Sequence, residues 1–404
     1  MLGAEQYGFG TVAMIAVGCK MARQCHLNTC PVGIATQRED LREKYFGTPE
    51  MLVSYLTHVA HEVREILAEL GFERLEQIIG RSDLLRQIPP EGDHRWRGVE
   101  LANIITPVDP EGLEPHFAVQ ERNDRPGTPL DDEIIKDIAD AIENGATAKR
   151  SYAVKNTDRT VGGRVSGMIA RKYGDEGLPE GTIDLHFKGS AGQLFGAWLV
   201  RGVNLTLVGE ANDYVAKGMS GGEISIRPPD DAGFLAHEAV LVGNTVLYGA
   251  TGGNLFIAGC AGERFAVRNS GARAVVEGVG DHCCEYMTEG VVVILGETGR
   301  NFGAGMSHGV VFVLDERGDF HTRMNQELVG LEEVTEANDI ELLEMLIARH
   351  HELTHSKRAL QVLEDWRLFL PKFWKVGTEL ALSEEGPMTV VRRHLDSLKE
   401  LAPA

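Results

Sequence analysis

The 404-residue chain carries a formal net charge of −20 and has a pI of about 5.2. A chain of this length is expected to form two or three domains and to bury a substantial core. The acidic excess argues against a surface that binds nucleic acid or an anionic membrane, since both require a basic footprint.

The chain starts with MLGAEQYGFGT, which has neither the charged leader nor the apolar core of a secretion signal. We therefore expect an intracellular, cytoplasmic protein whose six cysteines are reduced. Three of them, Cys19, Cys25 and Cys30, lie within twelve residues, and Pro31 follows the last. Thiolates this close together in a reducing compartment indicate a metal or cluster site rather than disulfides.

The cysteine spacing favours an iron-sulfur cluster over zinc. Structural zinc usually uses closely spaced cysteine pairs, and no C-x2-C pair occurs here. A zinc site would take His26 as a fourth ligand, and His26 adjoins Cys25, which makes tetrahedral ligation by both awkward. A cysteine followed by proline is typical of iron-sulfur loops. Zinc remains the alternative.

Thr48 and Pro49 predict the start of a helix, as N-cap and first helical residue, and Gly71 predicts its end. Its apolar residues follow a helical stripe. We interpret this segment as a core helix that anchors the cysteine loop. The stripe consists of Leu52, Tyr55, Leu56, Val59, Val63, Ile66, Leu67 and Leu70.

Residues 89–130 hold seven of the fifteen prolines and are interpreted as an extended connector. A short helix is expected from Asp131 to Asn144, where Asn144 and Gly145 form the stop. One face of this helix would carry Ile134, Ile135, Ile138, Ala141 and Ile142.

From about residue 181, a glycine repeatedly precedes a short β-branched or aliphatic run. The last four of these glycines, Gly253, Gly271, Gly290 and Gly309, are 18, 19 and 19 residues apart. This period is too short for a βαβ unit or a propeller blade and leaves no room for a crossover helix. Residues 162–170, GGRVSGMIA, are interpreted as a weaker, earlier copy.

The repeat predicts a mainly β fold, a right-handed parallel β-helix with flanking helical segments. Each repeat would form one coil, and glycines would supply turns with positive φ. An antiparallel sandwich, the alternative, predicts no fixed period. The uncharged run 239–262 contains six glycines and is not expected to span a membrane. Such a body has few catalytic side chains, so we expect it to serve as a scaffold.

Helices are expected after the repeats. Asn338 and Glu341 would form a capping box for the first, and Trp366, Leu370 and Pro371 would close the second. The domain boundaries are then 1–88 for the end of the cysteine-loop domain, 89–130 for the connector, 131–330 for the β-helix and 331–404 for the helical segment.

Two further groups of possible metal ligands are interpreted otherwise. His350, His351 and His355 lack an accompanying carboxylate or cysteine pattern, which favours surface or interface histidines over a metal set. Cys260, Cys283 and Cys284 fall within the repeats, where small buried thiols are common, although His282 adjoins Cys283.

The sequence GAEQYGFGTVAMIAVGCKMARQCHLNTCPVGIATQ resembles the end of the FMN domain of the glutamate synthase large subunit, and CHLNTCPVGIATQ is highly specific for that family. The segment EVREILAELGFERLEQIIGRSDLL, the glycine repeats and RHHELTHSKRALQVLEDW also resemble that subunit. The resemblance extends from residue 1 to about residue 376 and weakens at WKVGTELALSEEGPM.

The resemblance implies an oxidoreductase that makes glutamate from glutamine and 2-oxoglutarate. In that family a glutaminase domain releases ammonia, and reduced FMN passes a hydride to the 2-iminoglutarate formed. Cys19, Cys25 and Cys30 match the ligands of the family's 3Fe-4S cluster, which relays electrons to FMN from a small flavoprotein subunit or ferredoxin. GAEQYGFGT resembles the last strand of the FMN-binding (β/α)8 barrel, so the amides of Gly10 and Thr11 would approach the cofactor phosphate.

The family's large subunit is far longer than this chain. The nucleophilic cysteine of the glutaminase, the central domain and seven of the eight barrel strands have no counterpart here, and a lone barrel strand leaves its backbone unpaired. We therefore expect a fragment or split subunit that is inactive without the remaining large-subunit domains. The alternative is a non-catalytic β-helix module whose cysteine loop is stapled by zinc.

Overall fold

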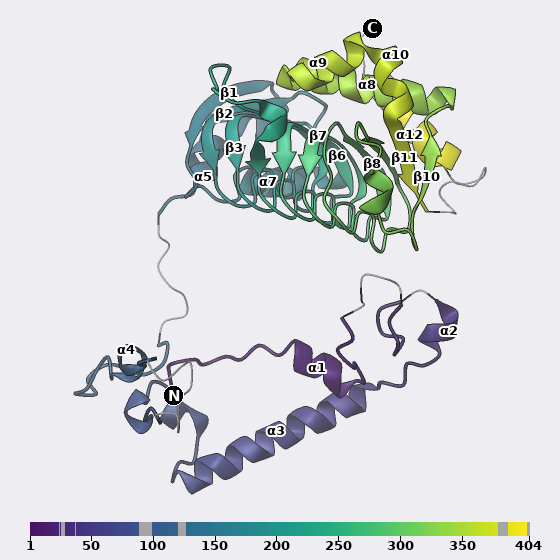
Figure 1. Ribbon diagram of the computed structural model, residues 1–404. Coiled ribbons are helices and arrows are strands. Elements are labelled where there is room, and N and C mark those ends of the chain that lie inside the picture. The colour runs from purple at the N-terminus through teal and green to yellow at the C-terminus, as the bar shows by residue number, and fades with distance from the viewer. Residues whose placement is uncertain are drawn as a thin grey trace. The chain divides into compact units, whose positions relative to one another are not determined.

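The computed structural model describes residues 1–23, 25, 29–36, 38–88, 99–119, 127–378 and 387–401. The chain divides into two compact units, with the division between residues 126 and 127. The first unit is helical, and the second is built around a large sheet (Figure 1).

The longest element of the first unit is α3 (Pro49–Glu69), which begins after Thr48 as predicted. Gly71, which follows it, has a φ of 81° and ends the helix. The other elements of this unit are the helices α1 (Thr11–Ala16), α2 (Glu39–Arg42) and α4 (Ala102–Ile105), and the 3₁₀ turns η1 (Leu75–Ile78) and η2 (Ser82–Leu84).

The prediction that α3 is a core helix is wrong for this chain. Leu67 is its one buried residue, whereas Tyr55, Val63 and Ile66 are 39%, 37% and 50% exposed. The apolar spacing does produce a helix, but the described part of this unit provides no second layer to cover the stripe. The buried apolar residues described in the unit are few, namely Cys30, Val32, Leu41, Leu67 and Ile79.

The second unit is a parallel β-solenoid, which confirms the predicted β-helix. Each strand from β1 to β4 and from β6 to β9 pairs in parallel with the next one along this series. The strands are β1 (Ala148–Val154), β2 (Ile183–Ala191), β3 (Val203–Ala211), β4 (Ser220–Arg227), β6 (Gly252–Ala261), β7 (Ser270–Val279), β8 (Glu289–Ile294) and β9 (Val310–Leu314).

Apolar side chains stack in register inside the coils. Leu185 of β2 pairs with Leu205 of β3, and the column continues through Ile224, Leu255 and Ala274, all at most 1% exposed. Burying one such leucine or isoleucine stabilises the fold by about 1.5–3 kcal/mol, so the column fixes the register of the coils.

The uncharged run 239–262 forms part of the solenoid. It contains β5 (Val240–Val242), which pairs with β3 and β6, and most of β6. Over the part of the chain that the structure describes, no helix is both long and apolar enough to cross a membrane.

The turns between strands alternate right- and left-handed backbone, with φ values of 68° at Leu194, 67° at Gly196 and 58° at Trp198. This alternation lets Trp198 donate its N–H to the Lys217 carbonyl of the next coil at 2.7 Å. Many of these positions hold side chains other than glycine, because the ladder between coils compensates for the strain. Glycine is needed at Gly218, where a Cβ would lie 2.8 Å from the Trp198 ring.

The helix expected from Asp131 to Asn144 is two helices, α5 (Leu130–Asp137) and α6 (Ala139–Asn144). They are separated at Ile138, whose φ of −115° and ψ of 18° depart from helical values. The predicted apolar face is buried at Ile134, Ile138, Ala141 and Ile142, and Ile135 is partly buried. Gly145 ends the second helix with a φ of 70°.

Residues 162–170 are not an early coil, so that prediction is wrong. They form the start of α7 (Gly163–Tyr173), in which Val165 and Ile169 are buried four residues apart, a helical rather than a strand spacing. The solenoid starts instead at β1, whose sequence AKRSYAV has no glycine directly before it.

Helices cover the outer face of the later coils (Figure 1). Leu342, Leu346 and Ile347 of α8 (Ala337–Thr354) pack on Phe256 and Val275 of the sheet. The antiparallel strands β10 (Gly330–Glu333) and β11 (Phe373–Gly377) close the end of the sheet. The remaining elements are η3 (Gly174–Glu176), η4 (Ala236–Glu238), η5 (Phe320–Thr322), α9 (Lys357–Glu364), α10 (Trp366–Phe369), η6 (Leu370–Lys372) and α12 (Pro387–Leu401).

The predicted ends of these helices are wrong in detail. Asn338 lies inside α8, whose N-cap is Glu336, and no side-chain hydrogen bond caps the helix. In the first turn Asp339 pairs with Lys375. The side chain that does cap a helix here is Ser356, which accepts the N–H of Ala359 at the start of α9. That helix ends at Glu364, and Trp366 begins α10 rather than closing α9, while Leu370 and Pro371 belong to η6.

Candidate functional site

Cys19, Cys25 and Cys30 lie between α1 and α2. Cys30 is buried, Cys19 is half-buried and Cys25 is exposed. The predicted ligands thus lie on one short stretch of the chain and differ in their exposure.

The surroundings of Cys30 favour its thiolate. Burial raises its pKa, but the backbone N–H groups of residues 32–35 outweigh this effect and hold the pKa below its ordinary value. The N–H of Met21 also lies 3.4 Å from the Cys19 sulfur. Backbone N–H groups directed at cysteine sulfur support metal-bound thiolates and tune iron-sulfur clusters. The donors around Cys30 therefore fit a cluster ligand.

Close backbone contacts fix both ends of the cysteine loop. Gly33 has a φ of 78°, and a Cβ there would lie 2.3 Å from the carbonyl oxygen of Leu41 in α2. A Cβ at Gly47 would lie 2.4 Å from the carbonyl oxygen of Val17. Only glycine allows these approaches, so the loop is held against α2 and against the segment that leads into α3.

The three cysteines are not gathered into a formed metal site. Among the described residues, no three His, Cys, Asp or Glu side chains are grouped where they could hold a metal ion. His26, the fourth ligand of the zinc alternative, lies outside the described residues, as do residues 24, 27 and 28 of the same loop. The ligand set Cys19, Cys25 and Cys30 stays a prediction.

Gly10 and Thr11 lie at the start of α1. Gly10 is the N-cap, and its carbonyl accepts the N–H groups of Ala13 and Met14. The N–H groups of Thr11 and Val12, the first two helical residues, precede any acceptor within the helix. Residues 1–10 form no strand, and Phe9 is 55% exposed, so a barrel strand and a phosphate site here stay predictions.

The three histidines at the end of α8 differ in exposure: His355 is exposed as predicted, His351 is half-buried and His350 is buried. His350 is fully buried, and its Nε2 lies 3.3 Å from Oε1 of the buried Glu277. His351 Nδ1 lies 2.9 Å from the Ser356 carbonyl oxygen, and His355 ends the helix with a φ of 55°. The prediction of surface or interface histidines is therefore wrong for His350, which joins α8 to the solenoid.

The cysteines of the solenoid are buried to different extents. Cys283 and Cys284 are fully buried, with their sulfurs 3.6 Å apart, whereas Cys260 is half-buried. Burial raises the pKa of Cys283 well above its ordinary value and that of Cys260 to about 11. Thiols in this state are inert, as expected for side chains that serve packing.

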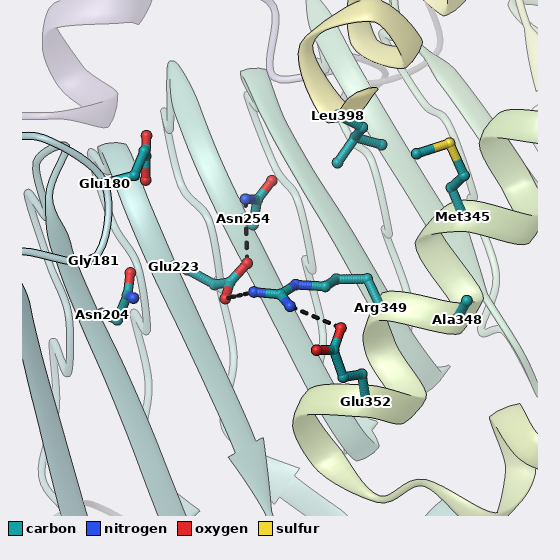
Figure 2. A pocket seen from close by; sticks show the side chains of 10 residues that line it. All are labelled: Glu180, Gly181, Asn204, Glu223, Asn254, Met345, Ala348, Arg349, Glu352 and Leu398. Atoms are coloured by element: carbon teal, nitrogen blue, oxygen red, sulfur yellow. Dashed lines mark hydrogen bonds and ion pairs between the residues drawn. The ribbon is translucent and has the colours of Figure 1, made fainter. Parts of the chain in front are cut away.

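A cavity of about 520 Å³ lies between the outer face of the sheet and helices α8 and α12 (Figure 2). Its floor follows one row of the sheet, where Asn204, Glu223 and Asn254 are in register on β3, β4 and β6. Met345 of α8 and Leu398 of α12 lie on the opposite side. This cavity falls within the usual size range of small-molecule sites.

Arg349 of α8 connects the roof of this cavity to its floor (Figure 2). Its Nη2 donates to Glu223 at 2.8 Å, and its Nη1 donates to Glu352 at 2.8 Å. Asn254 donates from Nδ2 to Glu223 at 3.5 Å, and its Oδ1 accepts from Nε of Arg273 at 2.8 Å. Burial raises the pKa of Glu223 despite the nearby Arg349 charge.

Both units match known sequence families. The profile described as GXGXG motif matches residues 131–379, and the one described as conserved region in glutamate synthase matches residues 1–73. The chain belongs to the glutamate synthase family.

The curated glutamate synthases to which the chain is similar are much longer. It is 50% identical over 380 residues to ferredoxin-dependent glutamate synthase 2 of Arabidopsis thaliana, a match that covers 93% of this chain and 23% of the relative. It is 49% identical to ferredoxin-dependent glutamate synthase 2 of Synechocystis sp., over 93% of this chain and 24% of the relative. It is 48% identical to the glutamate synthase [NADH] of Schizosaccharomyces pombe, over 93% of this chain and 18% of the relative. The chain therefore spans about a quarter of the length of such relatives or less.

Sequence reasoning missed the cavity of this glutamate synthase chain. Its floor residues each follow a repeat glycine closely, as in Gly202-Val-Asn204, Gly222-Glu223 and Gly253-Asn254. A polar residue that recurs just after the repeat glycine, in an otherwise apolar run, is the sequence signal that could have predicted this polar row. The partner on α8, Arg349, carries no such signal, because it lies 126 residues from Glu223 along the chain.

Proposed function

We propose that this chain supplies the 3Fe-4S electron-relay loop and the β-helix scaffold of a glutamate synthase, an enzyme that forms L-glutamate from 2-oxoglutarate and glutamine-derived ammonia. Membership of the family supports the reaction. The observation that carries the relay is the set of backbone N–H groups around Cys30, which favours a thiolate inside a loop of three cysteines.

In this proposal Cys19, Cys25 and Cys30 hold the cluster through their sulfurs. The bound cluster supplies one-electron transfer to FMN. The amides of residues 32–35 orient and polarise the Cys30 sulfur, and burial of Cys30 shields that side of the site from water. The N–H groups of Gly10 and Thr11, at the start of α1, would hold the FMN phosphate once the rest of the cofactor domain is present.

The first unit supports the view that the chain works with further domains. Apart from its few buried residues, it exposes large apolar side chains on α3 and on residues 1–10, where Leu2 is 61% and Tyr7 is 54% exposed. Surface of this kind marks an interaction site. We propose that it packs against the FMN barrel and that the glutaminase and central domains complete the enzyme.

The names of the relatives support a proposal for the electron donor. Two of those described above are named ferredoxin-dependent and one is named for NADH. We propose ferredoxin or a small flavoprotein subunit as the donor. The exposed Cys25 side of the loop lies on the surface of the first unit, where a protein donor has access to it.

The incompleteness is tested by assaying glutamate formation. The 404-residue chain, loaded with iron and sulfide, is supplied with FMN, 2-oxoglutarate, ammonia and chemically reduced ferredoxin. The proposal predicts no glutamate from this chain alone and glutamate once the remaining large-subunit domains are added. Glutamate formed by the chain alone would contradict it.

A structural module with a zinc-stapled loop is the second candidate function. One observation favours it: the greater part of the second unit is a stacked solenoid with a continuous buried core and a layer of covering helices. In that case the solenoid spaces other domains, and its buried columns and covering helices provide the stable scaffold that this requires. The two candidates differ in the bound metal and in acid-labile sulfide.

A further inference from the structure

The lining of the cavity beneath α8 and α12 has more free hydrogen-bond acceptors than free donors. Each of the two terminal nitrogens of Arg349 donates one hydrogen bond, Nη2 to Glu223 and Nη1 to Glu352. Asn254 uses both of its polar atoms within the network. The carboxylates that line the cavity, Glu180, Glu223 and Glu352, retain free lone pairs, since each accepts up to about four hydrogen bonds.

The charge within the lining is negative, with three carboxylates against the single guanidinium of Arg349. Two flanking cations, Arg201 and Arg273, balance the wider region. Arg201 bonds to Glu180 at 3.3 Å from outside the lining, and Arg273 is buried behind Asn254, where it also donates to the His394 carbonyl. The preference for a ligand therefore comes from the local supply of acceptors and not from the net charge.

Two classes of ligand fit poorly. An anion would lie beside three carboxylates, and the one guanidinium of the lining already shares its charge between Glu223 and Glu352, so repulsion opposes its binding. A metal ion lacks a suitable set of ligands, since the described residues contain no group of three His, Cys, Asp or Glu side chains that could hold one. A ligand that donates hydrogen bonds and carries positive charge meets neither obstacle.

The opposite side of the cavity is apolar. Met345 and Ala348 of α8 and Leu398 of α12 face the polar floor across the open space (Figure 2). A carbon chain laid along these side chains removes apolar surface from water at about 25 cal/mol per Å². The cavity thus combines one polar side rich in acceptors with one apolar side.

We propose that this cavity binds a small organic cation, an alkylammonium or guanidinium compound, whose charged head is held by Glu180, Glu223 and Asn204 and whose carbon chain lies along Met345 and Leu398. The side chain of Asn204 makes no hydrogen bond to another described residue, so its amide oxygen is available to the head group. Because the ligand bridges the sheet and both helices, its binding stabilises the docking of α8 and α12 on the solenoid.

The test is isothermal titration calorimetry on the full 404-residue chain with agmatine. Butylammonium chloride, 1-butanol and sodium butyrate form a matched series in which only the head group changes. The proposal predicts that agmatine and butylammonium bind at one site per chain and that butanol and butyrate do not. Equal binding of butyrate, or no binding of either cation at millimolar concentration, overturns it.

Three variants locate the site. Glu180→Gln and Asn204→Ala, which change partly exposed side chains that the fold does not need, are each expected to weaken agmatine binding about tenfold, the loss of one charge-assisted hydrogen bond. Glu210→Gln, the control, changes an exposed carboxylate on the same strand β3 as Asn204 and leaves binding unchanged. Thermal unfolding of each variant confirms that it is folded. Cation binding that is the same in all three variants shows that the cavity is not the site.

Discussion

Lys375 of β11 and Asp339 of α8 form a buried ion pair, with Nζ 2.8 Å from Oδ2 and with 7% and 5% of the two side chains exposed. The pair joins the strand that closes the sheet to the first turn of the helix that covers it. Losing one partner leaves a charge inside the protein, where it is poorly solvated.

Replacing one member of this pair is therefore expected to lower the stability of the chain strongly. Asp339→Ala should lower the free energy of unfolding by about 3–5 kcal/mol, and the double variant Asp339→Leu/Lys375→Met should lose less, because it leaves no buried charge. Glu297→Ala breaks the exposed pair with Arg317 and should cost about 0–1 kcal/mol. Chemical unfolding monitored by tryptophan fluorescence measures all three. A double variant as unstable as Asp339→Ala would show that packing, not charge, dominates.

The space around two glycines, one between coils and one on a helix, predicts opposite effects of replacing them with alanine. A Cβ at Gly209 on β3 would lie 1.8 Å from the carbonyl oxygen of Gly189, at a φ of 147°. Gly209→Ala should therefore destabilise the solenoid by more than about 2 kcal/mol. Gly167 lies exposed in the middle of α7 with open space around it, so Gly167→Ala should stabilise by about 0.5–1 kcal/mol. Thermal unfolding of both variants checks the signs, and a tolerated Gly209→Ala would contradict the register described.

The docking of α12 should weaken in mild acid. Burial, together with Arg273 and Arg393, lowers the pKa of His394 from 6.5 to about 4. The unfolded chain binds a proton between these values and the folded chain does not, so this contribution to stability is complete above pH 6.5 and is lost as the pH falls toward 4. The full loss is about 3 kcal/mol, at about 1.4 kcal/mol per pKa unit.

His394→Leu removes this pH dependence, since the buried Nε2 has no hydrogen-bond partner among the described residues. Urea unfolding at pH 7.5 and pH 5 should show that the original chain loses about 2 kcal/mol more than the variant does. His308→Gln, at an exposed position, should behave like the original chain. Identical pH dependence in His394→Leu would mean that the histidine is not buried in solution.

The exposed stripe of α3 predicts a variant that separates folding from assembly. Ile66 is 50% exposed, so Ile66→Lys should change the stability of the chain by less than about 0.5 kcal/mol. If the stripe packs against the FMN barrel, the same change should prevent association with the remaining large-subunit domains, measured by analytical ultracentrifugation. Glu65→Lys, on an exposed position of the same helix, is the control for added charge. Normal association of Ile66→Lys would place the contact elsewhere.

The repeat glycines predicted the body of the fold because each coil is a local unit with its own turn and strand. The runs after Gly202, Gly222, Gly253 and Gly271 all became strands in a parallel register. The first strand, β1, was not predicted, because no glycine directly precedes it. Its pairing with β2, which joins Ala148 to Ile183, also falls outside the period of the repeats.

What the sequence could not predict depends on contacts between distant segments. The pairing of Glu223 with Arg349 spans 126 residues, and the burial of His350 depends on Glu277, 73 residues earlier. The periodicity of α3 specifies a helix whether or not a partner layer is present, so it could not reveal that Ile66 is exposed. The cysteine spacing indicated a ligand loop, but the N–H groups around Cys30 came from the structure.

The most direct test of the central claim is the metal content of the chain purified without air, with iron, acid-labile sulfide and zinc measured together and an EPR spectrum of the oxidised state. The electron-relay proposal predicts about three iron and four sulfide per chain and a paramagnetic oxidised cluster that is lost in Cys25→Ser and retained in Cys260→Ser. About one zinc per chain without sulfide would contradict it and would support the zinc-stapled scaffold.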